Sequence, residues 1–214
     1  MTLFIFRHKN VTFRWTILSL FTIFTFSTST FGQSKQNELE QFLPRNYYCS
    51  TFNYFDIDSD GVKELFMVAQ REFTKKGEDV PWQEDNSIFL IWKFNLKRKK
   101  YELLEINHKF IIGHNHNCPL SELDLVFKDN YFTLSHSLCF GQFFLTDLTT
   151  FKYDKKLNQI VLHKVGMSFI DRYDTEKNIP DIVFSQKDFG IVQFADYESL
   201  EKLNIKVKYP EPKR

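Results

Sequence analysis

From residue 45 onward the chain is patterned in short runs rich in apolar and aromatic residues, separated by polar stretches. Such runs are typical of β-strands. Residues 47–54 and 65–73 predict the first two strands. The polar stretch 74–86, with Gly77 and Pro81, predicts an exposed loop between the second strand and the next apolar run.

Three further pairs of runs predict β-hairpins, because each pair is joined by a short polar bend. The pairs are residues 87–95 with 101–107, 123–127 with 131–136, and 148–153 with 159–164. Sequential hairpins favour an antiparallel meander that buries its aromatic face. We therefore predict a mainly β (β-rich α+β) fold, built as a sandwich or an open barrel.

The two ends of the folded region are patterned less regularly. Residues 35–43, with Ser34 as N-cap and Pro44 as stop, predict a short N-terminal helix. The C-terminal predictions are a loop or helical turn over 169–177, a strand over 190–194, a short helix over 197–203, an edge strand over 205–209 and a flexible tail over 210–214.

The first 32 residues have the three parts of a signal peptide. Arg7, Lys9 and Arg14 give a positive start, residues 17–26 are a short apolar stretch, and small residues precede a cleavage site after Gly32. An uncleaved membrane anchor is the alternative. We expect an exported protein, periplasmic or secreted, with a signal peptide (1–32), one β-rich domain (33–209) and the tail (210–214).

Charge gives no sign of a nucleic-acid partner. The chain has 28 basic and 27 acidic residues, and cleavage removes three basic residues and no acid, leaving 25 minus 27, or −2. A near-balanced chain has no overall attraction to nucleic acid or to an anionic membrane. We expect no membrane span after signal cleavage. The partner stays open, with an extracellular protein or a glycan as candidates.

Three cysteines follow the signal segment: Cys49, Cys118 and Cys139. Export to an oxidising compartment permits a disulfide, and an odd number leaves at least one thiol outside any bridge within the chain. We favour Cys118–Cys139, because their flanking segments are expected to be neighbours. Three buried, reduced cysteines are the alternative.

The most specific chemical pattern is the acidic segment 56–65, DIDSDGVKEL. Asp56, Asp58, Asp60 and Glu64 occupy positions 1, 3, 5 and 9 of a loop, Gly61 permits a sharp turn, and Val62 can add its carbonyl oxygen. Hard oxygen ligands at this density suit Ca²⁺. The segment is not a standard EF-hand, because position 12 is Met67 and the flanks are patterned as strands.

This segment resembles the calcium loop of FG-GAP and VCBS-type β repeats, as found in integrin propellers. The resemblance covers about residues 50–70 and implies a structural calcium ion between two strands, without implying a propeller. The order of elements, with residues 149–156 (TTFKYDKK) and 162–164 (LHK), also resembles small exported bacterial proteins of unknown function. That second resemblance implies no activity.

A second, weaker metal site is predicted from histidines. His114 and His116 would face one side of a strand, and His136 on a later hairpin could approach them. Three such ligands suit a transition metal with an open position, as in hydrolytic zinc sites. Solvated histidines in a loop are the alternative.

We find no catalytic motif in the sequence: no nucleophile elbow, no phosphate-binding glycine loop and no cysteine-protease signature. The basic run 97–100 is interpreted as a solvated hairpin bend. The leading hypothesis is a non-enzymatic exported β domain stabilised by one calcium ion, with a binding role at the surface or outside the cell. The alternatives are a small metal-dependent hydrolase using His114, His116 and His136, and an envelope inhibitor or stress factor.

Overall fold

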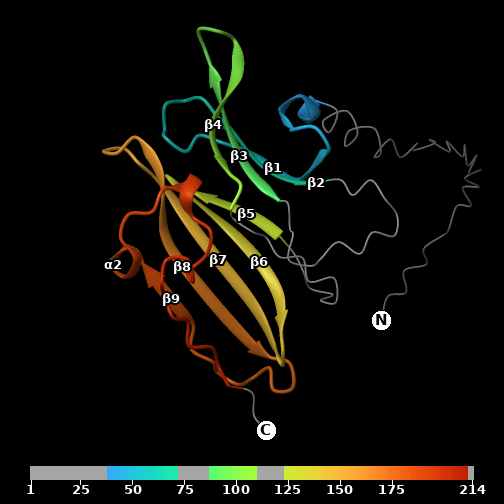
Figure 1. The fold of residues 1–214 in the computed structure, drawn as a ribbon, viewed down its shortest axis with the longest axis vertical. Helices are drawn as coiled ribbons and strands as arrows, with labels where there is room; N and C mark the ends of the chain where they lie inside the picture. Colours follow the sequence, from blue (N-terminus) through green and yellow to red (C-terminus); the bar gives the residue numbers. More distant parts are fainter. Residues whose placement is uncertain (1–37, 72–86, 110–122, 212–214) are drawn as a thin grey trace, which may run out of the picture.

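The structure, a computed structural model, describes residues 38–71, 87–109 and 123–211 (Figure 1). The described strands form two separate antiparallel sheets, each with its strands in sequence order. The prediction of a mainly β fold built as an antiparallel meander is confirmed. The predicted signal peptide and the loop over 74–86 lie outside the described residues.

Sheet A contains the first four strands and sheet B the next five. The bounds in sheet A are β1 (Tyr47–Phe55), β2 (Glu64–Arg71), β3 (Ile88–Asn95) and β4 (Lys100–Asn107). The bounds in sheet B are β5 (Leu123–Lys128), β6 (Tyr131–Phe140), β7 (Phe143–Asp154), β8 (Gln159–Asp171) and β9 (Ile182–Ser185). The bends predicted between the hairpin strands are present, and Lys99, Asp129 and Asn158 adopt positive φ in them.

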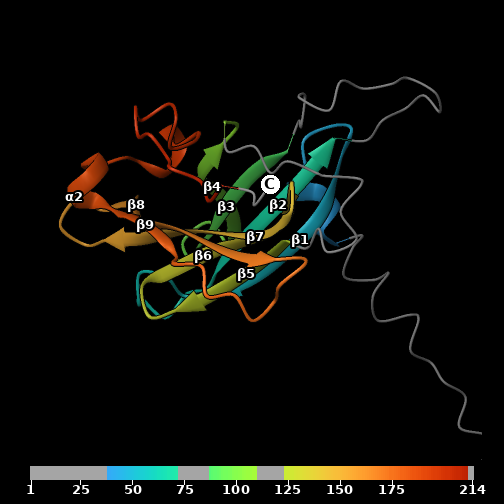
Figure 2. The same cartoon turned by 90° about the horizontal axis from the view of Figure 1, so that it is seen from below.

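The two sheets pack against each other across a shared aromatic core. Phe66 and Phe89 of sheet A contact Phe132 of sheet B, with ring centroids 5.0 and 5.6 Å apart. These rings are fully buried, and Phe151 of β7 stacks on Phe132 at 5.2 Å. In Figure 2 the strands of the two sheets run in different directions, so the layers overlap over only part of sheet B.

The rest of the inner face of sheet B is covered by the C-terminal segment, which follows η2 (Phe194–Asp196) and is red in Figure 1. Leu200, Ile205 and Val207 pack against the core, and Tyr209 meets Phe169 edge to face at 6.3 Å. Asn107, fully buried at the end of β4, holds this segment by donating its side-chain N–H to the carbonyls of Phe194 and Tyr197.

Several C-terminal predictions are wrong. The loop predicted over 169–177 is present only from residue 172 onward, because strand β8 extends to Asp171. The late strand is β9 rather than 190–194, and of those residues only Gln193 pairs, in a single bridge to Val161. Residues 197–199 have no regular structure and 200–204 form turns, so the helix predicted over 197–203 is absent; residues 205–209 pair with no strand. Packing onto sheet B overrides the local helical and strand patterns here.

The other new elements are short. α2 (Gln186–Phe189) is a single turn with a capping box formed by Ser185 and Asp188. Near the N-terminus η1 (Glu40–Phe42) is one turn of 3-10 helix; the helix predicted over 35–43 lies partly outside the described residues and stays a prediction. Leu39 and Phe42 pack on the outer face of sheet A. Within the described ranges, no helix has the length and apolar character needed to cross a bilayer.

Candidate metal centre

The acidic loop connects β1 to β2 and is shaped by its backbone. Ser59 and Gly61 have φ of 62° and 86°, values that place both in the left-handed region and reverse the chain within five residues. An added Cβ at Gly61 would meet nothing within 4 Å, so glycine is required there by its backbone conformation rather than by space. The predicted role of Gly61 is confirmed.

Each acid of the loop uses at least one oxygen to accept a hydrogen bond from the backbone. Asp56 accepts from the N–H of Asp60 (3.1 Å) and of Gly61 (2.9 Å). Asp58 Oδ1 accepts from the N–H of Asp60 at 3.2 Å, and Asp60 Oδ1 accepts from the N–H of Val62 at 2.9 Å. These bonds fix the carboxylates before any ion binds.

Glu64, the first residue of β2, lies at the C-terminal end of the loop. Its side chain is fully buried, and Oε2 accepts a hydrogen bond from the N–H of Ile57 at 3.0 Å. Ile57 is itself 1% exposed and belongs to the core shared by the two sheets. The loop is therefore tied at both ends to the folded core.

The remaining oxygens converge on one point, which holds the ammonium of Lys93. Lys93 projects from β3, and its Nζ forms ion pairs with Asp58 Oδ2, with Asp60 Oδ2 at 2.7 Å and with Glu64 Oε1 at 3.2 Å. One oxygen each of Asp56, Asp58 and Glu64 also lie within 4.8 Å of one another. Three acids that are up to six residues apart thus surround one cationic centre.

The electrostatics agree with this geometry. Burial alone would lower the pKa of Lys93, but the hydrogen bonds to Asp58, Asp60 and Glu64 outweigh it and raise that pKa. The hydrogen bond from Lys93 lowers the pKa of Asp60. Burial raises the pKa of Glu64, against the opposing effects of the Ile57 N–H and Lys93. Lys93 stays charged whether or not Glu64 is ionised, because Asp58 and Asp60 remain beside it.

The cluster carries an excess of negative charge. Four carboxylates and one ammonium sum to a formal −3 when all are ionised. Such an excess favours a cation of higher charge, and the oxygens suit a hard ion such as Ca²⁺, which takes six to eight oxygen ligands at about 2.3–2.6 Å. Val62, expected to supply its carbonyl, is held in the loop by its N–H; its role as a ligand stays a prediction.

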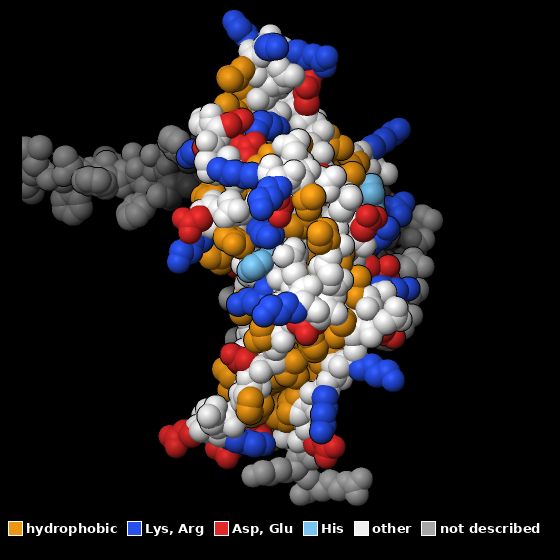
Figure 3. Space-filling view, turned by 90° about the vertical axis from the view of Figure 1, so that its left-hand side faces the viewer, with side chains coloured by type: hydrophobic (Ala, Val, Ile, Leu, Met, Phe, Trp, Pro, Cys, Tyr) orange, Lys and Arg blue, Asp and Glu red, His pale blue; other side chains and the backbone are white. Residues whose placement is uncertain are grey.

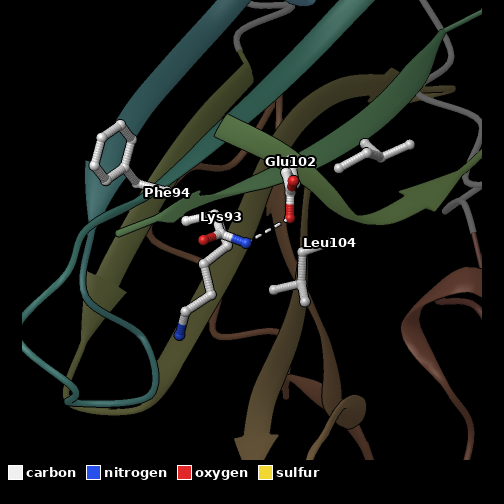
Figure 4. Close-up of a pocket in the computed structure, with 6 residues that line it drawn as sticks. Lys93, Phe94, Glu102 and Leu104 are labelled. Carbon is white, nitrogen blue, oxygen red and sulfur yellow. Dashed lines mark hydrogen bonds between the residues drawn. The ribbon is translucent and has the colours of Figure 1, made fainter. Parts of the chain in front are cut away.

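A hollow of about 310 Å³ lies on the hairpin beside Lys93. Figure 4 shows Lys93 and Leu104 on one side of the hairpin and Phe94 on the other. Asn95 and Glu102 also line it, joined by a hydrogen bond of 2.8 Å. Leu103 completes the lining, so the hollow is a mixed space beside Lys93 whose other polar groups are those of Asn95 and Glu102.

Lys93 is the site residue that the sequence analysis missed. A signal for it existed, because the period-two pattern places Phe89, Ile91 and Lys93 on the same inward face of β3. A lysine at an inward position requires an anionic partner. The partner lies 35 residues earlier in the chain, so no local pattern identifies it.

The histidine cluster is not assembled among the described residues. His136 lies on β6 with its side chain 8% exposed and in the inward-facing register of Phe132 and Leu134. His114 and His116 lie outside the described residues, so the metal site formed by the three histidines stays a prediction.

Cys139 is disulfide-bonded, and Cys49 is a free thiol whose pKa burial raises to about 11. The alternative of three reduced cysteines is therefore wrong. Cys118 lies outside the described residues, so the pairing Cys118–Cys139 stays a prediction.

Comparisons with known proteins identify no relative. No protein-family model matches the chain, and neither the curated proteins nor the solved structures contain a significant match. The resemblances of the acidic loop to FG-GAP and VCBS-type repeats, and of the chain to small exported bacterial proteins, stay predictions.

Proposed function

We propose that this protein is an exported, non-enzymatic β domain whose acidic loop binds one calcium ion in place of the Lys93 ammonium. The observation that carries the proposal is the convergence of Asp58 Oδ2, Asp60 Oδ2 and Glu64 Oε1 on a single cationic centre. Export is inferred from the sequence of residues 1–32. An extracellular protein or glycan ligand remains the expected partner.

Lys93 can be read as a resident counter-ion or as an occupant that calcium displaces, and two features favour displacement. First, the cluster keeps a formal charge of −3 with the ammonium in place, which a divalent ion would reduce further. Second, the Lys93 side chain is 28% exposed and borders the hollow lined by Asn95 and Glu102, so it can leave without entering the apolar core.

The ion would have a structural role. The loop joins β1 to β2, carries Ile57 into the shared core, and faces β3 through Lys93. Burial raises the pKa of Tyr153 on β7, and the charges of Asp58, Asp60 and Glu64 add to that rise, so the acids also act on sheet B. A cation at this junction would neutralise repulsion where the two sheets meet.

Thermal unfolding tests the proposal. At calcium concentrations about 100 times the dissociation constant, we expect about 2.7 kcal/mol of stabilisation, or roughly 5–10 °C in Tm relative to EDTA. Mg²⁺ should give a smaller shift, because it demands tighter octahedral geometry.

Two substitutions of aspartate by asparagine serve as site and control. Asp58→Asn should abolish the calcium shift. Asp154→Asn should keep the calcium shift, because Asp154 lies outside the acidic loop. It is a matched control because it too accepts backbone hydrogen bonds in a turn. An unchanged Tm on adding calcium to the wild type overturns the proposal.

A further inference from the structure

The end of the β3–β4 hairpin projects from sheet A. Strand β3 pairs with β2 only as far as Trp92, opposite Leu65, whereas its pairing with β4 continues to Asn95 opposite Lys100. The hairpin end is therefore two-stranded, and it forms the top of the molecule in Figure 1.

Four basic residues form the bend at this end: Lys97, Arg98, Lys99 and Lys100, all exposed. Glu102 neutralises part of the charge, with Arg98 Nη1 at 2.8 Å and Lys100 Nζ at 3.7 Å. No residue in the described ranges forms an ion pair with Lys97 or Lys99. Four positive charges and one negative leave a formal +3 on the bend.

Hydrogen bonds to Asn95 hold the shape of the bend in spite of its charge. Asn95 Oδ1 accepts hydrogen bonds from the backbone N–H of Lys97 (3.0 Å) and of Arg98 (3.1 Å). Like charges are thus held together by the backbone, and the charged patch exists before a partner arrives.

Apolar side chains lie among these charges. Leu96 is 67% exposed at the bend, and Leu103 and Leu104 are 45% and 43% exposed along β4. Figure 3 shows Lys and Arg side chains gathered at the top of the molecule with hydrophobic side chains directly below them. A soluble polyanion would satisfy the charges and leave the leucines in water. An anionic lipid surface would satisfy both groups.

We propose that the end of the β3–β4 hairpin, residues 96–104, docks on an anionic lipid surface, with the basic side chains at the headgroups and Leu96 inserted between them. The near-zero net charge of the chain does not oppose this, because charges beyond about 8 Å are screened at physiological salt. The acidic loop contacts Lys93 within strand β3, whereas Lys97 lies two residues beyond the end of that strand, in the bend.

Co-sedimentation of the purified protein with lipid vesicles tests the proposal, in EDTA so that calcium and the acidic loop play no part. We expect binding to vesicles of equal phosphatidylglycerol and phosphatidylcholine, and none to pure phosphatidylcholine. Each basic residue near such a surface contributes about fivefold in partition (about 1 kcal/mol). Lys97→Ala with Lys99→Ala should therefore weaken binding roughly 30-fold.

The β7–β8 bend provides a matched control. Lys155 and Lys156 are also adjacent to an exposed leucine, Leu157 at 43%, but that bend carries two basic residues rather than four. Lys155→Ala with Lys156→Ala should leave vesicle binding unchanged. Equal losses in the two double variants, or equal binding to both kinds of vesicle, overturn the proposal.

Leu96→Ser separates a lipid surface from a soluble polyanion. It removes the exposed apolar side chain and keeps every charge, so it should weaken vesicle binding about fivefold. Vesicle binding that is unaffected by Leu96→Ser and is displaced by heparin would identify the bend as a site for soluble polyanions and overturn the lipid assignment. All variants lie in exposed bends, and circular dichroism checks their folding.

Discussion

Replacing Lys93 with methionine separates the two roles that its ammonium can have. Lys93→Met keeps most of the aliphatic stem and removes the charge, so the acids lose the one cation within reach among the described residues. Without metal, the variant must bury Glu64, 0% exposed, and Asp58, 15% exposed, with no counter-charge. Calcium, if it binds as proposed, supplies that charge instead.

The size of the effect follows from burial. Removing one partner of a buried ion pair costs about 3–5 kcal/mol, and we take about 3 because Lys93 is 28% exposed. The pair with Asp60, 42% exposed, adds less than about 1 kcal/mol. For a domain of this size, about 3 kcal/mol corresponds to a fall in Tm of roughly 10 °C in EDTA.

Although Lys93→Met should destabilise the metal-free protein, it should increase its affinity for calcium. In the wild type the ion must break the interactions of Lys93, and in the variant it need not. A cost of about 3 kcal/mol corresponds to roughly 100-fold in dissociation constant, which is the upper limit of the gain in affinity. Saturating calcium should bring the Tm of the variant close to that of the calcium-bound wild type.

Isothermal titration calorimetry and urea unfolding, each with and without calcium, measure these effects. Lys63→Met is the control, because Lys63 is exposed in the same loop and contacts none of the acids through an ion pair in the described structure. If Lys93→Met is destabilised and calcium neither binds nor restores it, Lys93 is the resident cation and the loop is not a calcium site.

Three further predictions concern other parts of the chain. Burial raises the pKa of Asp147 to about 6, so its contribution to stability is full below about pH 4 and is lost as the pH rises through 6. Asp147→Asn should therefore be up to about 3 kcal/mol more stable than wild type at pH 8 and equal to it at pH 4, measured by urea unfolding. With its pKa raised to about 11, Cys49 should react slowly with Ellman's reagent at pH 8 in the native protein, and denaturation should release one rapidly reacting thiol per chain; three such thiols would contradict the disulfide at Cys139. Asn107→Ala removes hydrogen bonds to two carbonyls of the C-terminal segment and should cost about 2–4 kcal/mol in unfolding free energy; a loss below about 0.5 kcal/mol would show that Asn107 does not hold that segment.

Features set by neighbouring residues could be predicted from the sequence. The hairpins follow from paired apolar and aromatic runs and from bends such as those at Asp129 and Asn158, whose positive φ is tolerated by short polar side chains. The acidic loop follows from acids spaced two apart before Gly61. In both cases the interacting groups lie within a few residues of one another.

Features set by distant residues could not be predicted. The turns over 200–204 stand where a helix was predicted, because Leu200 packs into the core formed with sheet B. The first four strands of that sheet lie more than 25 residues earlier in the chain. Lys93 reaches Asp58 across 35 residues, and Asn107 reaches Tyr197 across 90. Only the sheet arrangement brings these pairs together.

A crystal structure of the protein grown in millimolar calcium tests the calcium site most directly, with anomalous scattering to identify the ion. We predict one calcium ion within about 2.3–2.6 Å of oxygens from Asp58, Asp60 and Glu64, and the Lys93 ammonium moved toward Asn95 and Glu102. An ammonium still seated between the three acids, with no anomalous signal beside it, would contradict the proposal.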